Sequence, residues 1–196
     1  MIIEQINNMQ RIKTLRMKKS LIIAMVLLAG SAFGQKKITK TGHAHFLSET
    51  AIENIEANNY KVTSTLSKED GAVVFSVPMQ SFEFENSTMQ KHYNSPKFLD
   101  TKKFPKATFK GKITNLSTVE FSKNGTYKVD VTGTMTMHGE SKDISAQATL
   151  TVNGETISGS TNFELTLADY KIAFEKGKPS TNIAKTIKID VKVKYD

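Results

Sequence analysis

The sequence contains no cysteine, no tryptophan and only four prolines among its 196 residues. Without cysteine there can be no disulfide bonds, thiolate metal sites or cysteine nucleophiles, so the fold must be stabilised by its core alone. A glycine-rich phosphate loop, a nucleophile elbow and a recognisable pair of catalytic carboxylates are also missing from the sequence. The common enzyme motifs therefore give no support for a catalytic function.

Long hydrophobic runs are scarce too, and the run Leu21–Ala29 is too short to span a bilayer. It follows the basic pair Lys18-Lys19 and precedes Ser31–Gly34, a segment with small residues at the positions that a signal peptidase reads. This order predicts a secretory signal peptide over residues 1–34, cleaved before Gln35, with residues 1–16 as an extension upstream of a start at Met17. We expect residues 35–196 to form one domain that is periplasmic or secreted.

Charge is moderately basic. The formal net charge is +8, but residues 1–34 contain five of the 27 Lys/Arg and one of the 19 Asp/Glu, which leaves +4 for the rest. Many lysines, including Lys110 and Lys192, fall on the polar positions of alternating stretches, which is typical of a solvated face. Weak contact with an anionic membrane surface is the alternative. Nucleic-acid binding is not expected, because no aromatic residues interleave with these lysines.

Strict alternation of apolar or small residues with polar ones is the main positive signal. A period of two predicts antiparallel strands with one apolar and one solvated face. The inward rows are rich in small residues, which leave room inside a sheet that closes on itself, so the pattern favours a container for an apolar molecule. The alternating stretches are Ala107–Thr114, Tyr127–His138, Ile144–Val152, Ile157–Leu167 and Ile187–Tyr195, and the small inward residues are Gly111, Gly133, Ala146, Ala148 and Gly159.

The predicted fold class is all-β: an eight-stranded antiparallel up-and-down barrel with one or two short helices. Hairpin turns are expected at Asn124-Gly125, His138-Gly139 and Asn153-Gly154. A bulge around Pro78–Ser81 would restore the inward facing of Phe82 and Phe84. The expected strands are 40–49, 60–67, 72–78, 106–114, 126–138, 143–152, 156–167 and 184–195.

Three connections interrupt this meander. Ser48–Ala57 has a capping pattern and predicts a short helix. Residues 85–105, with a helix near Ser87–Tyr93, form a long apolar connection that must cover something. Residues 168–182 are a second candidate cover.

Two segments resemble a known family. The run Phe98-Leu99-Asp100 to Phe104-Pro105, ending at Phe109, is similar to the F-D-x-x-x-F/Y-P-x-x-x-F signature of YceI-like proteins. Gly133–Lys142 resembles that family's G-x-L-T-x-H-G-x-T-K segment. The resemblance covers roughly residues 40–196. It implies a lipocalin-like exported barrel that holds a polyisoprenoid or other long apolar chain in its interior.

The candidate binding residues follow from the predicted facing, and no cofactor, metal or catalytic group is assigned. The large inward residues expected to touch a lipid are Phe46, Phe75, Phe109, Met135, Met137 and Phe163. The expected rim residues are Phe82, Phe84, Phe98, Tyr170 and Phe174.

Two other functions stay open at this point. One is an enzyme or accessory factor that acts on an isoprenoid or quinone, with His138 or the pair His43 and His45 as its active group. His43 and His45, together with His92 or His138, could alternatively hold a metal. The other is a filled barrel that acts as a stress-response interaction module. The sequence gives no oligomeric state.

Overall fold

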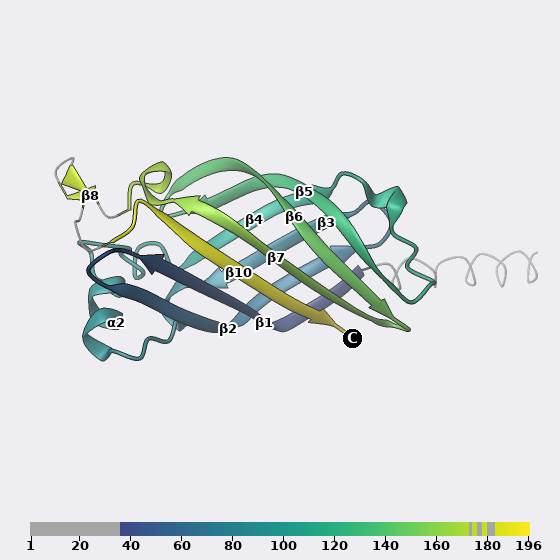
Figure 1. Ribbon diagram of the computed structural model, residues 1–196, viewed down its shortest axis with the longest axis horizontal. Coiled ribbons are helices and arrows are strands. Elements are labelled where there is room, and N and C mark those ends of the chain that lie inside the picture. Colours follow the sequence, from purple (N-terminus) through teal and green to yellow (C-terminus); the bar gives the residue numbers. More distant parts are fainter. Residues whose placement is uncertain (1–35, 173, 176–177, 180–182) are drawn as a thin grey trace, which may run out of the picture. The chain divides into compact units, whose positions relative to one another are not determined.

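The computed structural model describes residues 36–172, 174–175, 178–179 and 183–196 (Figure 1). The predicted signal peptide lies outside the described residues. Within them, no helix is long and apolar enough to cross a membrane.

Eight antiparallel strands close into a barrel in the order β1-β10-β7-β6-β5-β4-β3-β2, which confirms the predicted fold class. The chain runs up and down through neighbouring strands, and β10 returns to pair with β1. The barrel strands are β1 (Lys36–Glu49), β2 (Asn54–Ser67), β3 (Ala72–Pro78), β4 (Lys106–Ile113), β5 (Gly125–Met137), β6 (Glu140–Asn153), β7 (Thr156–Thr166) and β10 (Thr186–Tyr195). β8 (Phe174–Glu175) and β9 (Lys178–Pro179) form a separate two-stranded sheet.

The helix α2 (Ser87–Asn94) lies at the end of the barrel where β1 turns into β2 (Figure 1). It confirms the helix predicted near Ser87–Tyr93. The described 3₁₀ turns are η2 (Met79–Ser81), η3 (Leu116–Thr118) and η4 (Leu167–Tyr170).

The register of the sheet places inward residues opposite inward residues. Phe109 of β4 pairs with Met135 of β5, and Gly111 pairs with Gly133. On the other side of the barrel, Val191 of β10 lies opposite Thr161 of β7. A slip by one residue would turn the lysine-rich positions inward, so the alternating sequence fixes the register.

Two of the three predicted turns are present. His138 and Gly139 have φ of 52° and 83° and join β5 to β6 as a two-residue turn, and Gly154 has a φ of 58° between β6 and β7. The prediction of a hairpin turn at Asn124-Gly125 was wrong, because β4 and β5 are joined by the longer segment 114–124 that contains η3. Asn124 instead accepts a hydrogen bond on its side-chain oxygen from the Gly154 N–H at 2.8 Å.

The helix predicted over Ser48–Ala57 was also wrong, because β1 extends to Glu49 and β2 begins at Asn54. Thr50 closes the turn between them. Its N–H donates to the Glu53 carbonyl at 3.1 Å, and its hydroxyl accepts from the Glu53 N–H at 3.0 Å. A Ser or Thr followed by an acidic residue is compatible with a helix start, but here the hydrogen bonds form a tight turn.

The residue positions that point into the barrel shift at two places on the β2–β3 side. After β3, the turn η2 takes the place of the predicted bulge and brings Phe82 and Phe84 back to the interior. In β2, Tyr60 and Lys61 are both exposed, so the inward positions shift by one residue between Asn59 and Val62. Asn59 is fully buried and stabilises this irregularity, since its side chain accepts from the Lys61 N–H and donates to the Pro78 carbonyl, each at 2.9 Å.

Candidate ligand-binding cavity

The barrel interior contains a cavity of about 1100 Å³, lined by side chains from all eight barrel strands and from α2. This volume slightly exceeds the roughly 300–1,000 Å³ that is usual for small-molecule sites. The lining side chains are mainly aliphatic and aromatic. Such a cavity is suited to an apolar molecule and offers little to a polar one.

The small residues act in two different ways. Ala44, Ala107, Ala146 and Ala148 line the cavity and leave its volume free. The prediction that Gly111 and Gly133 also leave room was wrong, because the ring of Phe109 lies over both of them. A Cβ atom on Gly111 would be 2.6 Å from Phe109 Cζ, and one on Gly133 would be 2.8 Å from it. The two glycines thus accommodate an aromatic ring of the wall itself.

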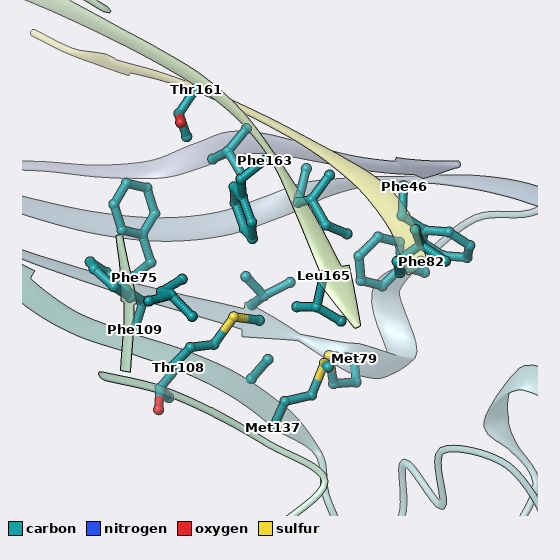
Figure 2. A pocket seen from close by; sticks show the side chains of 18 of the residues that line it. Phe46, Phe75, Met79, Phe82, Thr108, Phe109, Met137, Thr161, Phe163 and Leu165 are labelled. Carbon is teal, nitrogen blue, oxygen red and sulfur yellow. The ribbon is translucent and has the colours of Figure 1, made fainter. Parts of the chain in front are cut away.

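The structure places the six predicted inward residues on the cavity wall, and Figure 2 labels all of them except Met135. They are Phe46, Phe75, Phe109, Met135, Met137 and Phe163. Of the predicted rim, Phe82, Phe84 and Phe98 also line the cavity, whereas Tyr170 is buried elsewhere and is not part of the lining. The Phe174 side chain lies outside the described part of the structure.

Tyr93 of α2 is at the centre of an aromatic cluster at one end of the cavity. Its ring centroid lies 5.0 Å from that of Phe84, 5.7 Å from Phe82 and 6.0 Å from Phe46. Phe98 completes the cluster at 6.5 Å. Sequence reasoning grouped Tyr93 only with the apolar cover of the long connection. Its spacing of four residues from Met89, which also lines the cavity, was the signal that both face inward from one helix.

Local hydrogen bonds hold α2 in this position. Asn86 caps the helix, and its side-chain oxygen accepts from the Thr88 N–H at 2.8 Å and from the Met89 N–H at 3.4 Å. After the helix, the Thr101 hydroxyl donates to the Asn94 side-chain oxygen at 2.7 Å, and Thr101 is fully buried. The connection 85–105 is therefore an ordered wall of the cavity.

Polarity is unevenly distributed along the lining. Among the described lining residues, the titratable groups besides the tyrosines are Glu53, His92 and Lys97, all at the α2 end. The opposite end is surrounded by buried apolar side chains, including Leu66, Ile157 and Val193. The cavity consequently has one polar rim and one apolar end.

Of the four histidines singled out in the sequence, His92 lines this cavity and the other three do not. His43 and His45 face the barrel exterior, where His43 lies 2.8 Å from the Asn58 side-chain oxygen and His45 lies 3.0 Å from Glu56. His138 donates from Nδ1 to the Tyr170 carbonyl at 3.0 Å. Within the described residues no three His, Cys, Asp or Glu side chains form a group that could hold a metal ion.

Comparisons with known proteins agree with this geometry. The model of the YceI-like domain matches residues 35–195. A UPF0312 protein of Enterobacter sp. (strain 638) is 28% identical over 116 residues, a match that spans only 56% of each chain.

Solved structures share the fold. A polyisoprenoid binding domain from Saccharophagus degradans, implicated in plant cell wall breakdown, superimposes with a TM-score of 0.69 at 15% identity, covering 83% of this chain and 98% of the other. Burkholderia cenocepacia BcnA gives a TM-score of 0.66 at 16% identity, with coverage of 78% and 95%. The Campylobacter jejuni YCEI protein gives 0.58 at 22% identity, with coverage of 76% and 88%.

Proposed function

Since the chain belongs to the YceI-like domain family, we propose that it is an exported binding protein that holds a polyisoprenoid or similar long-chain lipid inside its barrel. The observation that supports this most directly is the long apolar cavity of about 1100 Å³ within a closed wall. The polyisoprenoid binding domain with the same fold supports the choice of lipid class.

The energetics favour a long chain over a compact ligand. Each buried CH₂ group contributes about 0.8 kcal/mol, whereas association costs an estimated 4–15 kcal/mol in lost freedom of motion. A few prenyl units could therefore offset that cost. Met79, Met135 and Met137 line the cavity, and their unbranched side chains can repack around an irregular chain.

The proposed role is sequestration or transport without catalysis. The enzyme hypothesis depended on His138 or on the pair His43 and His45, and in the structure these side chains contact polar groups away from the cavity. A lipid in the barrel would not reach them. The filled-barrel hypothesis is not favoured either, because the interior is hollow.

Export is proposed from the sequence of residues 1–34. It predicts that the native host processes the chain before Gln35. Cell fractionation with mass determination of the mature protein tests this directly. A full-length chain in the cytoplasm would contradict it.

Identification of the bound molecule tests the lipid proposal. The protein should be purified from its native host without detergent, extracted with organic solvent and analysed by mass spectrometry. We expect a long-chain apolar molecule in stoichiometric amount. Extracts that repeatedly contain no such molecule would contradict the proposal.

A further inference from the structure

The Tyr93 hydroxyl is a buried donor with no hydrogen-bond partner among the residues that the structure describes. The residue is only 5% exposed, and burial raises the pKa of this phenol well above its usual value, so the hydroxyl keeps its proton. An unpaired buried hydroxyl costs stability, because it has lost its hydrogen bonds to water. A ligand oxygen that reached this hydroxyl could supply the missing hydrogen bond.

Tyr93 is also part of the cavity wall. The residue lines the cavity at the α2 end, inside the polar rim of Glu53, His92 and Lys97. At the opposite end the Tyr195 hydroxyl is already paired with Ser64 at 2.7 Å. The Thr161 hydroxyl, on the wall between, donates to the Gln147 carbonyl at 2.7 Å. Among the described residues that line the cavity, Tyr93 alone has a buried side-chain hydroxyl without a hydrogen-bond partner, which favours the α2 end for the polar end of a lipid.

The surroundings of Tyr93 limit the charge of that polar end. The rings packed around it are those of Phe46, Phe82, Phe84 and Phe98, and Phe46 lies close to Phe82 in Figure 2. None of these side chains carries charge. The basic side chains of the lining, His92 and Lys97, are exposed at the rim. A phosphate buried among the rings would lose its water there, which is far more costly than burying a neutral oxygen.

From these observations we infer that Tyr93 binds the polar end of the lipid, and that this end is an uncharged oxygen acceptor such as a hydroxyl or carbonyl. The Tyr93 hydroxyl donates to that oxygen, and the chain extends away from α2 toward Leu66 and Tyr195. This inference depends on the proposed function, because it assigns the orientation and the headgroup class of the proposed lipid.

The test compares three ligands with the same twenty-carbon prenyl chain: geranylgeraniol, the hydrocarbon that lacks its oxygen, and geranylgeranyl monophosphate. Each competes with a fluorescent long-chain lipid for the delipidated protein. We expect the wild-type protein to bind the alcohol more tightly than the hydrocarbon and more tightly than the phosphate. Y93F should weaken alcohol binding about fivefold to tenfold, as expected for one lost hydrogen bond, and leave hydrocarbon binding unchanged.

Y170F is the matched control. The Tyr170 hydroxyl is also buried without a partner among the described residues, but Tyr170 does not line the cavity. This substitution should change the affinity for none of the three ligands. Thermal unfolding of the unliganded Y93F protein should occur at or above the wild-type temperature, because the variant removes a polar group that is unpaired in the fold.

The outcomes separate this inference from the proposed function. If both the alcohol and the hydrocarbon bind but Y93F weakens them equally or not at all, Tyr93 only packs against the ligand and the headgroup assignment is overturned. Tighter binding of the phosphate overturns the uncharged class. If neither prenyl compound binds the wild-type protein, the proposed lipid-binding function fails, and the assignment of Tyr93 fails with it.

Discussion

The hydroxyl of Tyr195 in β10 lies 2.7 Å from the hydroxyl of Ser64 in β2, although the two residues are 131 positions apart in the sequence. β1 lies between their strands in the barrel. It presents Gly42 to its neighbours, and a Cβ atom there would be 2.9 Å from Val193 Cγ1 of β10 and 3.1 Å from the Val62 carbonyl oxygen of β2. The absence of a side chain at Gly42 thus allows residues of β10 and β2 to approach each other across β1.

Replacement of Tyr195 by Phe should lower the free energy of unfolding by about 1–3 kcal/mol, because the Ser64 hydroxyl would be left buried without its partner. Urea denaturation measures the change. The double variant with Ser64→Ala should be less destabilised than the sum of the two single variants. The exposed Tyr60 supplies the control, since Tyr60→Phe should have an effect within about 0.5 kcal/mol. Strict additivity of the two core substitutions would contradict a direct interaction.

Alkaline pH should destabilise the barrel through its buried phenols. Burial raises the pKa of Tyr93 and of Tyr195, so the folded chain retains protons that the unfolded chain loses above about pH 10. Stability is therefore present below that pH and falls as pH rises, by up to about 1.4 kcal/mol per pH unit for each tyrosine. Urea denaturation between pH 8 and pH 11 should show a shallower decline for Tyr93→Phe than for Tyr60→Phe. Equal slopes for the two variants would contradict a raised pKa of Tyr93 in the folded protein.

Gly133→Ala should destabilise the protein by about 1–3 kcal/mol. The new methyl group would be 2.8 Å from Phe109 Cζ and would also collide with the backbone of Gly111 and Lys110, which cannot move away. Gly125→Ala is the matched control at the start of the same strand, because its nearest obstacle is the flexible side chain of Tyr127. Chemical denaturation should give a clearly larger loss for Gly133→Ala. Equal losses would mean that the position of the Phe109 ring does not require glycine at these sites.

Ala146→Phe should weaken binding of a long-chain lipid about tenfold or more, because the ring would occupy space for at least two CH₂ groups at about 0.8 kcal/mol each. Ala146 lines the cavity, whereas the neighbouring Ser145 is exposed on the outer face. Ser145→Phe is therefore the control and should bind as the wild type does. Fluorescent lipid titration measures both variants, and circular dichroism verifies that the sheet is retained. Undiminished binding by Ala146→Phe would place the lipid elsewhere.

Asn86→Ala should accelerate lipid release about fivefold, because loss of the helix cap destabilises α2 by about 1 kcal/mol. α2 contributes Met89 and Tyr93 to the wall, so local opening of this helix uncovers the cavity. The dissociation rate of a fluorescent lipid is the measurement. Thr88→Ala is the control, because the Thr88 N–H and not its side chain contacts Asn86. An unchanged rate for Asn86→Ala would mean that release does not involve α2.

The barrel could be predicted from the sequence because strand alternation and short turns, which specify most of it, are local features of the chain. The alternation in β4 to β7 and β10 fixes which face of each strand is buried, and a two-residue turn such as His138-Gly139 fixes the register beside it. The inward positions of Phe163 and Met135 followed from this alternation. The facing of Phe82 followed from the expected irregularity after β3.

The structural features that could not be predicted from the sequence depend on contacts between residues that are distant in the chain. The ring that covers Gly111 and Gly133 belongs to Phe109, and only the paired register of β4 and β5 brings all three together. The Thr50 turn has hydrogen-bonding residues that are equally compatible with a helix start, so the choice is made by pairing of β1 and β2 in the barrel. The shift of facing after Asn59 depends on the Pro78 carbonyl of the neighbouring strand.

The seam between β1 and β10 has a consequence for when this chain can fold. His43 pairs with Lys192, and Phe46 pairs with Ile189, so the sheet closes only after residues 186–195 have left the ribosome. Contacts of such long sequence separation form slowly. Closure of the barrel therefore depends on the last of its eight strands and is expected to be a late step in folding.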